Sequence, residues 1–187
     1  MPTYLALGDS MSIDEYTGVD GGGAVRQFHA WLGSDWRLDD RTMDGCRMED
    51  VPLDGRGEVI TLTIGGNDLL WNREQYLAGG LQPFAVEHQK LLRSLRSANP
   101  GALLIVGDIY HPDATLSERE FEAFSAANRI IRSHCLQVDA GLAPIYDTFR
   151  GRESELLCYQ IEPTLAGATA IAGLFRERYE EGLARGE

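Results

Sequence analysis

The chain has 187 residues, a length that suits a single domain spanning residues 1–187, and 17 basic against 29 acidic side chains give a formal net charge of −12. Its 43% hydrophobic and 25% charged residues are typical of a globular protein, which excludes a disordered, collagen-like or coiled-coil chain. The acidic balance, with no cluster of Lys and Arg, predicts neither a nucleic-acid partner nor a membrane partner.

Cysteine usage bears on the cellular compartment. Cys46, Cys135 and Cys158 form neither an even disulfide framework nor a C-x-x-C pair, so we expect reduced thiols, no metal site and a cytoplasmic location. The N-terminal residues lack the basic segment and apolar run of a signal peptide, and no later run approaches the length of a membrane span. A natural leader omitted from this sequence would leave the same pattern.

Apolar runs alternate with helical patterns along the whole chain, which favours an α/β protein built around a largely parallel sheet. Five strands are predicted, at residues 3–8, 36–43, 59–64, 102–109 and 142–146.

Helices are expected between these strands, where apolar residues recur at helical spacing. The first opens near the glycine run 21–23, a long one ends near Asn99, and the last has Pro163 in its first turn. Their expected buried residues are Val25, Phe28, Phe84, Leu91, Leu92, Leu95, Phe121, Phe124, Ile130, Ile131, Leu165, Ile171, Leu174, Phe175 and Tyr179.

Polarity along the strands predicts their order. Strand 36–43 carries Arg37 and Asp39 among its charges, and strand 142–146 contains Pro144, so both suit sheet edges. With the other three strands interior and right-handed crossovers, the common doubly wound order is 2-1-3-4-5. The connections reverse direction between the first and third strands, and ligands bind at that point, beyond the carboxyl ends of the strands.

Three loops should converge there, from the carboxyl ends of the first, second and third strands. They carry the short polar motifs Gly8-Asp9-Ser10, Asp44-Gly45 and Gly66-Asn67-Asp68. The Ser10 hydroxyl is a candidate nucleophile, and the backbone N–H groups of Ser10 and Gly45 with the Asn67 amide are candidate oxyanion donors. Each motif alone is more typical of a turn or a helix cap, but their joint position favours a site for acyl transfer.

These motifs resemble the SGNH or GDSL-type hydrolases, a family of esterases, lipases and carbohydrate-ester deacetylases. The resemblance covers nearly the whole length and implies a three-layer α/β/α sandwich with a flavodoxin-like parallel sheet. It also implies that Ser10 is the nucleophile, that Ser10, Gly45 and Asn67 hold the oxyanion, and that no cofactor is needed.

The family's last motif is altered in this chain. That motif is an Asp, two residues and a His, commonly followed by Pro and a later Gly; here Pro163 and Gly167 set the register. Glu162 therefore stands at the histidine position and Tyr159 at the aspartate position. A glutamate has a reference pKa of ~4.3 against ~6.5 for histidine, so it is a poorer proton acceptor unless burial raises its pKa. Glu162 is either a general base or a negative charge favoured at the start of the last helix.

Other residues near the predicted site are weaker candidates. His111 follows strand 102–109 on the same sheet edge as Ser10 and is the best-placed alternative base. We expect Asp9, His111 and Tyr159 to contact substrate. Trp71 could line a pocket after Asn67, as could Tyr76, and the glycine run 21–23 favours a lid loop over an anion cradle.

Three hypotheses remain open. In the first, Ser10 attacks a small acyl or carbohydrate ester and Glu162 takes its proton; in the second, His111 is the base. In the third, the chain is a pseudo-hydrolase that binds a ligand in the same crevice. The expected partner is a small-molecule ester, and no pattern in the sequence identifies the acyl group or an oligomeric state.

Overall fold

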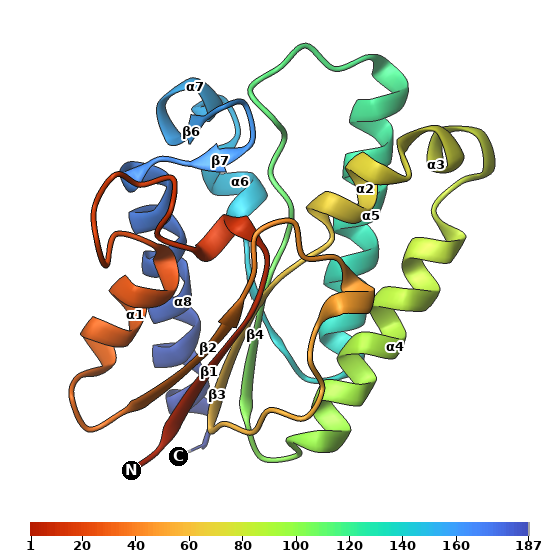
Figure 1. The fold of residues 1–187 in the computed structure, drawn as a ribbon. Coiled ribbons are helices and arrows are strands. Elements are labelled where there is room, and N and C mark those ends of the chain that lie inside the picture. Colours follow the sequence, from red (N-terminus) through yellow and green to blue (C-terminus); the bar gives the residue numbers. More distant parts are fainter. Residues whose placement is uncertain (187) are drawn as a thin grey trace.

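A computed structural model describes residues 1–186 and contains a five-stranded parallel sheet in the order β2-β1-β3-β4-β5 (Figure 1). A separate antiparallel pair, β6 and β7, lies beyond the carboxyl ends of these strands (Figure 1). The strand bounds are β1 Thr3–Gly8, β2 Arg37–Thr42, β3 Val59–Thr63, β4 Leu103–Gly107, β5 Gly141–Ala143, β6 Leu157–Cys158 and β7 Glu162–Pro163. The predicted sheet order is confirmed.

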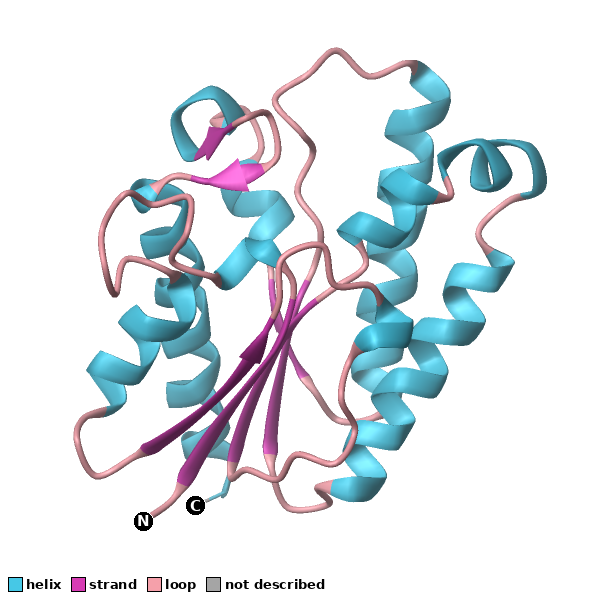
Figure 2. Ribbon diagram, viewed as in Figure 1, coloured by secondary structure: helices cyan, strands magenta, loops and turns pink. Residues whose placement is uncertain are grey.

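Helices cover both faces of the sheet, as Figure 2 shows. α1 and α8 pack together on one face, and α4 and α5 pack together on the other, which makes the three-layer α/β/α architecture (Figure 1). The helix bounds are η1 Ser10–Ser12, α1 Ala24–Leu32, η2 Met48–Asp50, α2 Gly66–Trp71, α3 Arg73–Gly79, α4 Gln82–Ala98, α5 Glu118–Gln137, α6 Ile145–Phe149, α7 Glu153–Leu156 and α8 Leu165–Gly186.

The alternation of side chains along β1 explains why the sheet has two cores. Every residue of β1 is buried. Tyr4 joins the apolar cluster under α1 and α8, whereas Leu5 and Leu7 join the cluster under α4 and α5. A strand buried on both faces needs the nearly continuous apolar run that identified it in the sequence.

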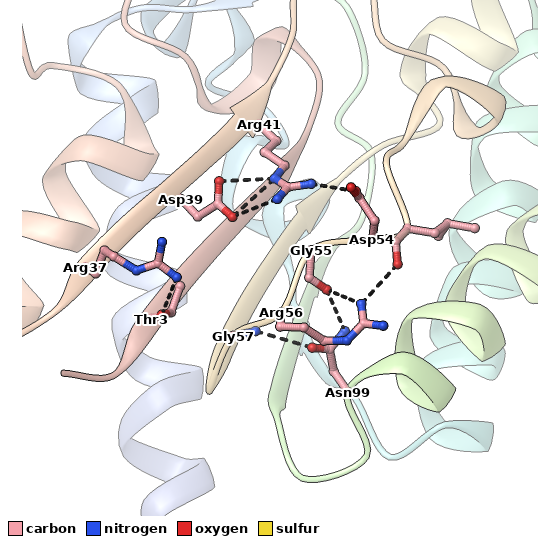
Figure 3. A network of polar contacts seen from close by, with 10 residues as sticks. Thr3, Arg37, Asp39, Arg41, Asp54, Gly55, Arg56, Gly57 and Asn99 are labelled. Atoms are coloured by element: carbon pink, nitrogen blue, oxygen red, sulfur yellow. Dashed lines mark hydrogen bonds and ion pairs between the residues drawn. The ribbon is translucent and has the colours of Figure 1, made fainter.

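The edge strand β2 is held by polar contacts (Figure 3). Arg41 donates to the carboxylates of Asp39 and Asp54, at 3.0 and 2.6 Å. Nearby, Asn99 accepts a hydrogen bond from the N–H of Gly57, which ties the loop before β3 to the end of α4. Two of the charges that predicted an edge strand, Asp39 and Arg41, therefore pair with each other in partly exposed positions, where they also discourage pairing with another strand.

Two sequence-based expectations about element ends were wrong. Strand β5 ends at Ala143, because Pro144 is the N-cap of α6 and Ile145 already belongs to that helix. Pro163 is not in the first turn of the last helix: it pairs with Leu157 in the β6–β7 hairpin, and α8 begins at Leu165.

Two residues expected on buried helix faces are exposed. Phe121 is 49% exposed near the start of α5, and Leu165 is 41% exposed at the start of α8. Both stand at helix ends, where the helix extends past the sheet that it covers. Within residues 1–186, no helix combines the length and the apolar character that a bilayer crossing requires.

Candidate active site

Ser10 is positioned by the tight turn that follows β1. Gly8 has φ 127°, and a Cβ atom there would lie 1.9 Å from the Thr63 carbonyl oxygen, so only glycine fits. The Asp9 N–H donates to that same oxygen at 2.9 Å. Ser10 is then the first residue of η1, where its own N–H has no acceptor within the helix. The residue is 8% exposed, so Ser10 is nearly enclosed at the carboxyl ends of the strands.

The second and third predicted motifs meet beside it. Asn67 lies in the first turn of α2, directly after β3, and its Nδ2 donates to the Cys46 carbonyl oxygen at 3.0 Å. This bond ties α2 to the turn that contains Gly45, whose φ is 70°. Because an amide nitrogen carries two hydrogens, Asn67 keeps one donor for another acceptor.

Ser10 and Asn67 line one cavity of about 40 Å³. Asp9 and Gly66 line it as well, and its other walls are mostly apolar. The structure thus brings the candidate nucleophile and the candidate amide donor to the same small space.

Glu162 approaches Ser10 from the β6–β7 hairpin, which packs against η1. Only 7% of the Glu162 residue is exposed. Burial is the main cause that raises its pKa, the nearby Ser10 hydroxyl lowers it, and the charge of Asp44 raises it further. Among the described residues, Glu162 Oε2 has no hydrogen-bond partner. A carboxylate with raised pKa beside a serine hydroxyl can act as a proton acceptor.

Tyr159 does not orient that carboxylate. It is 81% exposed at the tip of the hairpin, with φ 48°, and its ring packs edge-on against Tyr16 at 6.3 Å between centroids. The hairpin is instead tied down by Tyr110, whose hydroxyl donates to the Ile161 carbonyl oxygen at 2.6 Å. Sequence reasoning missed Tyr110, although it directly precedes His111 in the loop after β4.

His111 lies away from the cavity that Ser10 lines. Its ring packs against Phe121, Phe124 and Tyr146, and it lines another hollow together with Glu153. Burial lowers its pKa. Tyr110 and Pro112 line the Ser10 cavity on either side of it in sequence, but His111 does not. The structure therefore does not bring His111 to the reacting groups.

Asp9 shapes the turn that carries the serine. Its carboxylate accepts the Met11 N–H at 3.2 Å as the N-cap of η1, and only 2% of the residue is exposed. Burial and the nearby charges of Glu162 and Asp68 raise its pKa well above the ordinary value. Asp9 thus lies at the cavity wall with its carboxyl turned to the backbone.

The remaining sequence candidates lie around the site. The N–H groups of Gly21 and Gly23 both donate to the Asp14 carboxylate, so they are occupied by an internal anion. Trp71 is 75% exposed, and Tyr76 lines a second cavity beside the first. The cysteines are free thiols, and no group of three His, Cys, Asp or Glu side chains within residues 1–186 is placed to hold a metal ion.

Comparison with solved structures gives lipases and esterases of the same fold. A lipase from a goat rumen metagenome matches with a TM-score of 0.81 at 21% identity, over 95% of this chain and 97% of that chain. A catalytic mutant of Axe2, an acetylxylan esterase from Geobacillus stearothermophilus, gives 0.75 at 13% identity, over 95% and 93%. Phospholipase A1 from Streptomyces albidoflavus gives 0.66 at 19% identity, over 95% and 99%.

Sequence comparison identifies the family. No curated protein sequence matches the chain significantly. A family model described as the GDSL-like lipase/acylhydrolase family matches residues 6–170, a span that contains all three loop motifs and Glu162. Since this match covers far more than half of the chain, the predicted resemblance is confirmed, and the protein belongs to the GDSL-like lipase/acylhydrolase family.

Proposed function

We propose that the protein is a serine-dependent carboxylic-ester hydrolase in which Glu162 replaces the usual histidine base. The observation that carries this proposal is the buried Glu162 carboxylate beside the Ser10 hydroxyl, next to the cavity that Asn67 lines. A nucleophile, a proton acceptor and an oxyanion donor are the groups that acyl transfer requires.

The reaction proceeds in two halves. Glu162 accepts the Ser10 proton as the serine oxygen bonds to the ester carbonyl carbon, and the tetrahedral intermediate then expels the alcohol, which takes the proton from Glu162. In the second half Glu162 accepts a proton from water, whose oxygen attacks the acyl-serine. Collapse of that intermediate releases the acid and returns the proton to Ser10.

The negative oxygen of each intermediate is stabilised by three donors. The first two are the backbone N–H groups of Ser10 and Gly45, and the third is the Asn67 hydrogen that is not bonded to Cys46. Donors fixed by a tight turn and by an internal hydrogen bond need little reorganisation when charge develops on the substrate.

Turnover of p-nitrophenyl butyrate by the purified chain tests the proposal. The Ser10→Ala variant should lose turnover and labelling by an alkyl fluorophosphonate, and Glu162→Gln should be slowed at least about a hundredfold. Ser12→Ala is the matched control, because the Ser12 hydroxyl pairs with Thr63 and lies outside the cavity lining. Equal rates for the wild type and Ser10→Ala would contradict the enzymatic function.

A pseudo-hydrolase that only binds a ligand is the second candidate. It is favoured by the unpartnered Glu162 Oε2 and by the exposed position of Tyr159, since neither this tyrosine nor another described hydrogen-bond donor holds that oxygen in place. In that case the wild type should have almost no turnover, and Glu162→His with Tyr159→Asp should create it. If the wild type already hydrolyses esters through Ser10, this candidate is excluded.

A further inference from the structure

A second, larger cavity of about 220 Å³ adjoins the one that contains Ser10. It lies between α2, α3, α5 and the loop before α5. Leu70, Pro112, Phe124 and Ile161 line both cavities, so the two hollows share walls. A molecule bonded to Ser10 could extend from the first cavity into the second past these side chains.

The walls of this second cavity are suited to an apolar group. Its lining includes Leu69, Leu77 and Leu116, together with the shared Leu70 and Phe124. Its charged lining residues, Arg73 and Glu120, pair with each other at 2.7 Å, and Glu120 is also bonded to Ser117. Because these two charges are already paired, an anionic ligand group finds no free charged partner there.

The position of Glu162 indicates which half of an ester enters the cavity. Glu162 must hand its proton to the departing alcohol, so the alcohol leaves on the Glu162 side of Ser10. Glu162 lines neither cavity. The acyl group, which stays bonded to Ser10, then lies on the cavity side.

We propose that the second cavity is an acyl-chain subsite and that the substrates are esters of linear, medium-length fatty acids. The acyl-chain subsite rests on the proposed ester hydrolysis. It narrows the range of substrates, because it excludes acetyl esters as the preferred ones. A methylene group and a water molecule occupy similar volumes, roughly 30 Å³, so the cavity of about 220 Å³ accommodates roughly seven carbons beyond the carbonyl carbon, which corresponds to an octanoyl group.

Chain-length selectivity is the first test. For p-nitrophenyl esters from acetate to laurate, kcat/KM should rise about fourfold for each methylene buried and stop rising near octanoate. A flat profile with Ser10-dependent turnover would overturn the subsite while leaving the hydrolase function intact. Loss of Ser10-dependent turnover for every ester would contradict the proposed function instead.

Two isomeric esters test the orientation. Methyl octanoate and heptyl acetate have the same composition, but only the first carries its long chain on the acyl side. The acyl subsite predicts a much higher kcat/KM for methyl octanoate. A preference for heptyl acetate would overturn the assignment.

Variants that change the cavity volume link the selectivity to the structure. Ala123→Trp fills the second cavity without touching the first, so it should shift the optimum to shorter chains and lower octanoate turnover far more than acetate turnover. Glu122→Trp, on the exposed side of α5, is the matched control. Leu116→Ala enlarges the cavity and should shift the optimum to longer chains, which provides a test if Ala123→Trp does not fold.

A binding measurement keeps the subsite testable without catalysis. Calorimetry with the Ser10→Ala variant should give tighter binding of methyl octanoate than of methyl acetate. Adding Ala123→Trp to that variant should remove the difference. Equal affinities for the two esters would overturn the subsite whether or not the wild type is an active hydrolase.

Discussion

Burial gives Glu162 a basicity that its residue type would not otherwise have. The sequence left two roles open, a general base and a charge at the start of the last helix. The structure places the side chain next to Ser10 and three residues before the start of α8, on a separate strand. Its environment is therefore that of a buried carboxylate, and its pKa is raised mainly by loss of solvation.

The pH dependence of the rate should report that carboxylate. A base acts only when deprotonated, so kcat/KM should fall as the pH drops through the pKa of Glu162, at a midpoint above the ordinary glutamate value. Glu162→His should move this midpoint toward the histidine range. Both profiles can be measured with a non-ionising ester between about pH 4 and pH 8. A wild-type profile that is flat through this range would exclude Glu162 as the base.

The Asn67 amide should act on the intermediate more than on the bound ester. Asn67→Ala is expected to lower kcat about 10²- to 10³-fold with little change in KM, because the oxyanion exists only after attack. Asn72→Ala is the matched control, since its amide also donates to a backbone oxygen, that of Asp68, but lies outside the cavity lining. Steady-state kinetics should therefore show a large loss of kcat for Asn67→Ala and almost none for Asn72→Ala. Equal losses of kcat in the two variants would contradict the role of Asn67.

At the scale of elements, the central sheet was predictable and the hairpin that carries Glu162 was not. Strands β1 and β3 are buried along their full length, so their apolar runs stand out in the sequence. Strands β6 and β7 have two residues each, too few for any periodicity, and Tyr159 and Gln160 between them adopt positive φ values that residue type does not indicate.

The candidate site was likewise only partly predictable from the sequence. Ser10 and Asn67 were found because short motifs mark strand ends and helix starts, and Glu162 was found because Pro163 and Gly167 align the chain with the last motif of the family that it resembles. The walls of the cavities come from Tyr110, Phe124 and Leu70, on a loop and two helices whose relative placement depends on tertiary packing. His111 was chosen instead of Tyr110 because the sequence does not reveal which of two neighbouring loop residues faces inward.

Tyr110 should act as a positioning residue through the hairpin. Tyr110→Phe removes its hydrogen bond to Ile161, next to Glu162, and should lower kcat about tenfold while costing about 1 kcal/mol of stability. Tyr4→Phe removes a similar buried bond, to Thr61, on the sheet. It should cost comparable stability but leave kcat unchanged. Kinetics and thermal unfolding of both variants check this; an equal effect on kcat would mean that Tyr110 has only a structural role.

Across the whole molecule, a buried histidine pair joins the two helices on one face of the sheet. His88 on α4 and His134 on α5 approach through their Nδ1 atoms at 3.0 Å, and their rings are stacked. Burial and the neighbouring His134 lower the pKa of His88 to about 3. The pair is therefore neutral in the folded protein at neutral pH, while the unfolded chain binds protons near pH 6.5.

Acid should weaken the fold through this pair. Because the folded pKa of His88 is depressed, its contribution is fully present above about pH 6.5 and is lost as the pH falls toward 3, by about 2 kcal/mol at pH 5. Asp68, whose pKa burial raises to about 6, contributes with the opposite sign. Urea unfolding at several pH values should therefore be compared between the wild type and the double variant His88→Leu, His134→Leu. The variant should lose less stability between pH 7 and pH 5; parallel curves would contradict the assignment.

The proposed nucleophile and the proposed base are anchored to the molecule with unequal strength. Ser10 follows a fully buried central strand by two residues, whereas Glu162 depends on a two-residue ladder beyond the sheet. Local opening of such a short ladder requires less free energy than melting of the core strands. Mild heating should therefore abolish ester hydrolysis while the circular dichroism of the sheet and helices is still unchanged. Cooling should restore the hydrolysis rate.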